Sequence, residues 1–155
     1  MIDIVLLILC ILLGFWLGRR WERQMWLREE VISLHCEFAR NLLSNVKCGK
    51  VAMAQFVSEF AAECKSEAFV QCVDKFFYGK ETLIGVRLTS QQLKCIEDFW
   101  SGKFTSTQQF VSHIEYYIDY FTNLSKQLKE ECRQRSSLGV KLGILLGSAV
   151  GLMLI

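Results

Sequence analysis

Proline is absent from this chain of 155 residues, where ordinary usage would supply about seven or eight. Proline breaks helix interiors and is frequent in turns, so its absence favours long helices with short connections and argues against a sandwich-like fold. The seven cysteines are scattered and include no Cys-x-x-Cys pair, which indicates reduced thiols used as small apolar residues in a cytoplasmic domain. No glycine-rich phosphate loop occurs either, which argues against nucleotide hydrolysis by this chain.

Catalytic and metal-binding patterns are also missing. His35-Cys36 is the one His-Cys neighbour pair, and adjacent helical positions point in different directions. No serine, cysteine or histidine has a triad-like setting, and acidic pairs such as Glu29-Glu30 are interpreted as solvated helix faces. The net charge of +2 gives no argument for nucleic acid. We expect no enzyme activity, no cofactor and no metal site.

The apolar residues, 52% of the chain, concentrate at its two ends. Residues 2–18 are uncharged apart from Asp3 and would form a helix of about 25 Å, near the shortest that crosses a bilayer. A signal peptide fits poorly, because the basic residues follow the apolar run. Residues 138–155 would span about 27 Å, with Lys141 near the interface. Both ends are predicted to be transmembrane helices; a buried core helix is the alternative for the second.

Basic residues flank both apolar ends on the side of the central segment. The positive-inside rule therefore puts residues 19–137 in the cytoplasm and both termini across the cell membrane. The same side chains suit anionic lipid headgroups as well as topology. The residues assigned this role are Arg19, Arg20, Arg23, Arg28 and Lys141.

Glycine recurs every four residues in the second apolar end and forms one smooth helical stripe. Small residues let helix backbones approach closely in lipid, so the stripe predicts a packing face for another helix, in the same chain or in another one. The first apolar end carries a shorter version. The predicted packing residues are Gly14, Gly18, Gly139, Gly143, Gly147 and Gly151.

The central segment has helical apolar spacing throughout. The first helix would continue from the membrane to about Val46, and the next three would cover roughly 53–64, 69–79 and 89–100. A heptad-like seam, as in a coiled coil, predicts a last helix from about 105 towards the second membrane helix. Capping boxes are predicted at Thr89 with Gln92 and at Thr105 with Gln108, and 80–88 is predicted to be a loop, with a short strand as an alternative. The fold class is thus all-α: an antiparallel bundle of about five helices flanked by two transmembrane helices.

The layout resembles the stage III sporulation protein AB family. The likeness lies in Gly14-Phe15, in Gly18-Arg19-Arg20-Trp21 and in the glycine-rich stretch from Ser137 to Gly147. The family's helical domain is similar to that of type II secretion inner-membrane platform proteins. The resemblance implies a non-catalytic part of the channel complex of endospore formation, on the mother-cell side. Its partners would be a secretion-type ATPase and other membrane components.

A different function class fits the same ends. The chain would then be a membrane-anchored regulator or a small oligomeric pore former, with the glycine stripe lining a homo-oligomer. In either case the functional surface would bind proteins or lipid rather than convert a substrate.

Overall fold

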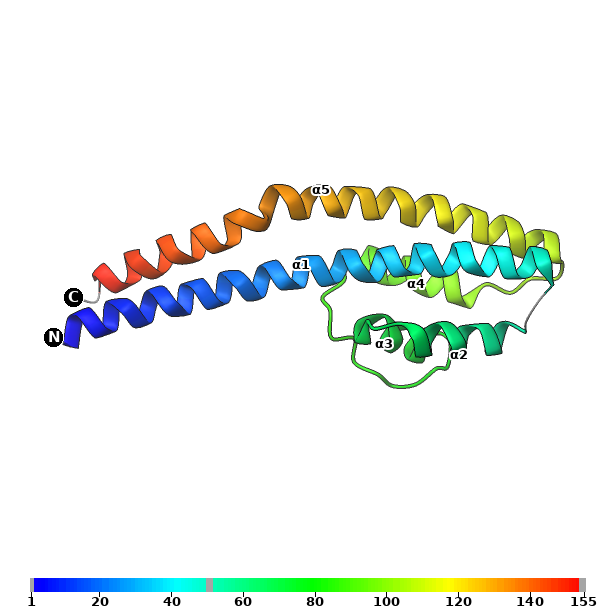
Figure 1. Cartoon of the computed structure of the whole chain (residues 1–155), viewed down its shortest axis with the longest axis horizontal. Helices are drawn as coiled ribbons and strands as arrows, with labels where there is room; N and C mark the ends of the chain where they lie inside the picture. The colour runs from blue at the N-terminus through cyan, green and yellow to red at the C-terminus, as the bar shows by residue number, and fades with distance from the viewer. Residues whose placement is uncertain (1, 50–51, 154–155) are drawn as a thin grey trace. The chain divides into compact units, whose positions relative to one another are not determined.

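The structure, a computed structural model, describes residues 2–49 and 52–153, and over these residues it is all-helical, without a strand. The five helices of the described part are α1 (Ile2–Cys48), α2 (Met53–Glu63), α3 (Glu67–Phe76), α4 (Ser90–Ser101) and α5 (Thr107–Met153) (Figure 1). The all-helical class and the helical segments predicted from apolar spacing are confirmed. Each apolar end is continuous with a helix of the central segment, because α1 and α5 run unbroken for 47 residues.

Local chemistry sets the ends of these helices. Gly49 directly follows α1 and has φ of +61°, a left-handed conformation that glycine adopts without the steric cost of a Cβ. At the start of α4, the backbone N–H of Gln92 donates to Thr89 Oγ1 at 3.2 Å, and the backbone N–H of Thr89 donates to Gln92 Oε1 at 3.0 Å. The predicted capping box at Thr89 is therefore present.

The second predicted capping box, Thr105 with Gln108, is wrong by one residue. Helix α5 begins at Thr107, so Ser106 occupies the cap position and its Oγ accepts from the backbone N–H of Gln109 at 3.3 Å. The hydroxyl of Thr105 instead donates to Gln109 Oε1 at 2.8 Å. Thr105 and Ser106 are both good cap residues, and sequence spacing alone did not separate them.

The chain divides into two compact units: Met1–Trp26 with Gln127–Ile155, and Leu27–Lys126. We call them the terminal unit and the central unit. These limits follow from packing, whereas the predicted limits at 18/19 and 137/138 follow from charge. The membrane boundaries therefore stay a prediction.

Aromatic side chains form the core of the central unit. Phe38 of α1 is fully buried, and its ring centroid lies 5.0–6.2 Å from those of five rings on α2, α3 and α4. The described part of α5 joins this cluster through Phe121, which lies 5.6 Å from Phe99 of α4. Aromatic pairs at such separations add to the free energy of burial, so this cluster holds the five helices together within the unit. The rings around Phe38 are Phe56, Phe60, Phe69, Phe99 and Trp100.

The segment between α3 and α4 is irregular, as the loop prediction for 80–88 expected, and the alternative of a short strand is wrong. Side chains of the central unit hold it in place. Arg28 Nε donates to the carbonyl oxygen of Arg87 at 3.0 Å, and the Gln71 side chain accepts from the backbone N–H of Gly85 at 2.7 Å. Val86, within this segment, is buried.

Candidate functional site

The terminal unit is held together by its glycines. A Cβ built on Gly18 would lie 2.5 Å from the carbonyl oxygen of Gly139, and Gly14 and Gly143 lie closer still to each other. A Cβ on Gly147 would lie 2.5 Å from the carbonyl oxygen of Cys10. No real Cβ tolerates such distances, so a side chain at these positions would push the two helical segments apart.

We call this contact the glycine seam. It brings together all six glycines predicted for helix packing, since a Cβ on Gly151 would lie 2.6 Å from Cδ1 of Leu7. The sequence left open whether the stripe packs within one chain or between chains. In the structure the glycines of α5 face α1 of the same chain.

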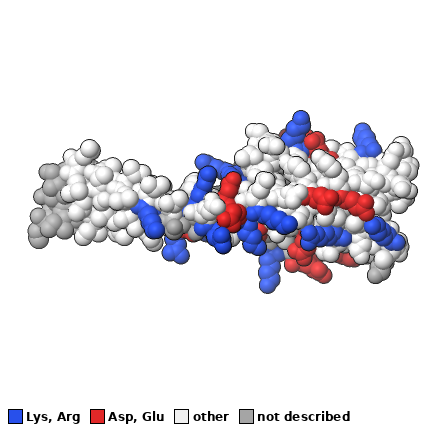
Figure 2. Space-filling model, turned by 90° about the horizontal axis from the view of Figure 1, so that it is seen from above, with Lys and Arg blue, Asp and Glu red and all other residues white. Residues whose placement is uncertain are grey.

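Outside the seam, both helices of the terminal unit expose many large apolar side chains. Leu12 and Leu145, for example, are 60% and 62% exposed. In Figure 2 the part of this unit near the chain termini is almost entirely white, so few charged side chains are visible there. An apolar surface of this extent is typical of contact with lipid or protein rather than with water. The exposed large apolar residues of the unit include Val5, Ile8, Leu9, Leu12, Leu13, Trp16, Leu17, Leu138, Leu142, Leu145, Leu146, Val150, Leu152 and Met153.

An apolar groove of about 460 Å³ runs beside the seam. Leu13 and Leu17 line it from α1, and Leu142 and Leu146 line it from α5, with seam glycines as its floor. All of its lining residues belong to the terminal unit. A groove of this kind accepts hydrocarbon, because it offers no charged side chain within its walls.

The predicted lipid-facing basic residues fall into different settings. Arg19, Arg23 and Lys141 are exposed. The Arg20 guanidinium carbon lies 5.4 Å from the ring centroid of Trp16, a cation–π arrangement. Arg28 belongs to the central unit, where it binds the loop carbonyl of Arg87.

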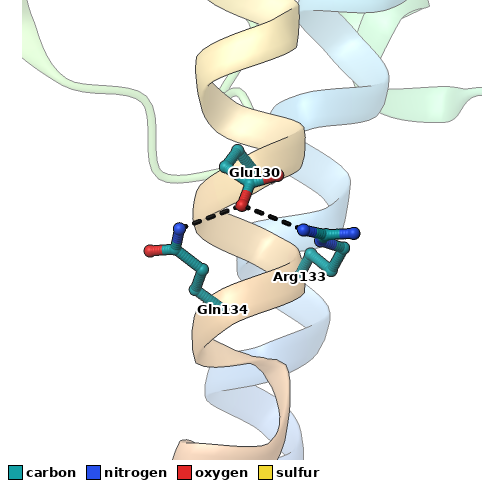
Figure 3. A network of polar contacts seen from close by, with 3 residues as sticks. All are labelled: Glu130, Arg133 and Gln134. Atoms are coloured by element: carbon teal, nitrogen blue, oxygen red, sulfur yellow. Dashed lines mark hydrogen bonds and ion pairs between the residues drawn. The ribbon is translucent and has the colours of Figure 1, made fainter.

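A polar network lies on α5 within the terminal unit (Figure 3). Glu130 Oε1 accepts from Arg133 Nη2 at 3.3 Å and from Gln134 Nε2 at 2.9 Å. The charge of Arg133 is therefore partly neutralised by Glu130, which lies three residues earlier on the same helix. The pair is largely exposed and contributes little to stability.

Two polar groups of the central unit, Glu29 and His35, are buried in the structure. Glu29, interpreted above as solvated, is only 9% exposed and accepts from the hydroxyl of Ser125 at 3.0 Å, so that interpretation is wrong. His35 is fully buried, with Nδ1 2.7 Å from the carbonyl oxygen of Val31 and Nε2 3.5 Å from Nε1 of Trp100. Burial lowers the pKa of His35 to about 4, so the ring is neutral at physiological pH.

Two cysteines of the central unit, Cys72 and Cys95, are not activated thiols. Burial raises the pKa of Cys72 to about 12 and that of Cys95 to about 11, so both stay protonated near neutral pH. Cys95 lies in a shallow groove of about 180 Å³ with Lys94, Tyr116 and Tyr120. We call this the tyrosine groove. Tyr116 is 63% exposed there, which makes it available to a protein partner.

Within the described residues, no cluster of three or more His, Cys, Asp or Glu side chains could hold a metal ion. In the same part of the chain, one helix, α5, is long and apolar enough to cross a membrane. Comparison with known proteins finds no matching family model, curated protein or solved structure. The functional argument therefore rests on the glycine seam, the apolar surface around it and the central unit.

Proposed function

We propose that the chain is a two-span membrane protein whose terminal unit lies in the bilayer and whose central unit stands in the cytoplasm. The observation that carries the proposal is the apolar exposure around the glycine seam. Leu12 and Leu13 on α1 and Leu145 and Leu146 on α5 are all more than half exposed, although both helices already pack on each other. In water such a surface would drive aggregation, whereas hydrocarbon solvates it.

Charge supports the proposed sidedness. Arg19, Arg20 and Arg23 follow the apolar run of α1, and Arg133 and Arg135 precede that of α5. Basic residues are retained on the cytoplasmic side of membrane helices, so both flanks agree on the same side for the central unit. Lys141 lies about one turn inside the proposed second span, which begins at residue 138, and from there its flexible stem reaches the headgroups.

In this arrangement the central unit acts as a non-catalytic platform. The thiols of Cys72 and Cys95 are protonated, and the exposed Tyr116 offers a binding contact. Together with the resemblance to the stage III sporulation protein AB family, this favours a docking surface for a secretion-type ATPase. The complex would serve endospore formation, with the central unit on the mother-cell side.

Two measurements test this proposal in sequence. Alkaline carbonate extraction of cell membranes should leave the chain in the pellet, and its release would contradict membrane insertion. The full chain in nanodiscs should then bind the secretion-type ATPase of its own organism more tightly than empty nanodiscs do. Equal binding at both low and moderate salt would rule out the docking role.

A pair of exposed positions locates the docking surface. Tyr116→Ala should weaken binding of the ATPase, because exposed aromatic side chains carry much of the energy of protein interfaces. Ser58→Ala, on the exposed face of α2, is the matched control and should leave the affinity unchanged. Equal affinities of both variants for the ATPase would show that the docking site lies outside the tyrosine groove.

The alternative of a pore former needs the glycines to face another copy. The seam argues against it, because Gly14 and Gly18 already face Gly143 and Gly139 of the same chain. Leu145→Cys, at an outward position of α5, provides the test in membranes. A cross-linked dimer that the parent chain does not form under the same oxidation would favour the pore, and a monomer favours the platform.

A further inference from the structure

The apolar groove beside the glycine seam has an arginine near one end of its lining on each helix: Arg135 lies one turn before Gly139 on α5, and Arg20 lies next to Trp21 on α1. On α5, Arg135 precedes Gly139 by four residues and Leu142 by seven, and both of these line the groove. Residues at these separations share a helix face, so Arg135 lies on the groove's face of α5. On α1, Arg20 follows Leu17 by three residues and Leu13 by seven, and both of these also line it.

We propose that this groove binds one anionic phospholipid, with an acyl chain along Leu13, Leu17, Leu142 and Leu146 and the phosphate between Arg20 and Arg135. The inference rests on the proposed membrane insertion and adds a specific ligand to it. Basic residues at the mouth of an apolar cleft between membrane helices are complementary to an anionic headgroup on an acyl chain. A zwitterionic phospholipid would fill the apolar part and carries the same phosphate, but its headgroup cation would be repelled by the two guanidinium groups and would weaken the binding.

The position of Arg20 fits this role. Its guanidinium lies over Trp16, in the direction of the bilayer, at 5.4 Å from the ring centroid. Trp21, which lines the groove, lies at the same level of α1. Tryptophan rings favour the headgroup region, so the mouth of the groove falls where phosphates are found. Glu131, the nearest carboxylate on the Arg135 face of α5, lies one further turn from the groove.

Arg133 provides a matched control. It has the same charge and lies two residues from Arg135, and its guanidinium donates to Glu130 (Figure 3). Residues two apart on a helix point in different directions, so Arg133 stands on another face of α5 than Arg135. A non-specific attraction between the basic flank and anionic lipid would depend equally on both arginines. A site in the groove depends on Arg135 and Arg20 and not on Arg133.

The test is native mass spectrometry of the full chain in mild detergent, titrated with phosphatidylglycerol, phosphatidylcholine or glycerol phosphate. We expect one phosphatidylglycerol to bind per chain. Its affinity should fall about fivefold in each of the variants Arg20→Gln and Arg135→Gln and should not change in Arg133→Gln. Leu142→Trp should block the groove, whereas Leu145→Trp, which does not line it, should not. Retention of glycerol phosphate would identify a headgroup site without the acyl chain and would overturn the proposal.

Three other outcomes would also overturn it. Equal affinity for phosphatidylcholine would remove the role of charge, and equal losses for Arg133→Gln and Arg135→Gln would indicate non-specific attraction. A lipid-free dimer that Leu142→Trp dissociates would identify a second copy as the occupant. A chain that resists carbonate extraction yet fails these tests leaves the membrane proposal standing, while a chain released by carbonate contradicts both.

Discussion

Acidification should destabilise the central unit through His35. The ring is fully buried against Phe69 and Phe121, with centroids 4.8 and 5.7 Å away. We assign the proton to Nδ1, because that nitrogen faces the Val31 carbonyl, which leaves Nε2 to accept from the indole N–H of Trp100. A second proton would place a charge among aromatic rings and would abolish the acceptor for Trp100.

The magnitude follows from linkage. The pKa of His35 is about 4 in the folded chain, against an ordinary value of 6.5. Between these values the unfolded chain binds one more proton than the folded chain, so stability falls as pH falls through this window. The pKa difference corresponds to about 3 kcal/mol lost by pH 4, with a slope of at most about 1.4 kcal/mol per pH unit.

The assay is urea unfolding of the full chain in detergent micelles. Unfolding is monitored by hydrogen exchange in peptides from the central unit, Leu27–Lys126. His35→Leu removes the titrating group, so the difference in unfolding free energy between wild type and variant should shift by about 3 kcal/mol from pH 7 to pH 4. Other titrating groups affect both chains and cancel in this difference. His35→Phe, which keeps an aromatic ring in the cluster, should give the same shift. A difference that stays constant over this range for both variants would refute the reasoning.

Three further changes test other parts of the structure. Gly18→Leu places a side chain against the Gly139 carbonyl and should lower the unfolding free energy in micelles by about 1–3 kcal/mol, measured as a fall in thermal midpoint; an unchanged midpoint would contradict the seam. Ser106→Ala should cost about 1 kcal/mol as a lost helix cap, and Thr105→Ala less, in urea unfolding; the reverse order would restore the cap predicted from the sequence. Phe38→Ala should cost about 3–5 kcal/mol by the same measurement, because the side chain is fully buried, and a cost below 1 kcal/mol would exclude the aromatic cluster as the core.

Features set by neighbouring residues were predictable from the sequence. The helical segments follow from apolar spacing, and the start of α4 follows from Thr89 with Gln92. Each depends on residues within a turn or two, where propensity and capping chemistry decide the outcome. The start of α5 was missed by one residue because Thr105 and Ser106 compete for the same role.

Features that need a distant partner were not predictable in the same way. From the sequence Glu29 is interpreted as a solvated carboxylate, because its partner Ser125 lies 96 positions later in the chain. His35 likewise meets Trp100 across 65 positions. The fourfold glycine repeat predicted a packing face, but its spacing carries no information about which helix covers that face.

Topology mapping tests the central claim most directly. Epitope tags with protease sites are added at each end of the full chain and, in a third version, after Leu83, which is 92% exposed in the loop between α3 and α4. Protease added to intact spheroplasts should remove both terminal tags and leave the loop tag uncut until the membrane is permeabilised. Cleavage of the loop tag in intact spheroplasts, or protection of either terminal tag, would contradict two membrane spans flanking a cytoplasmic domain.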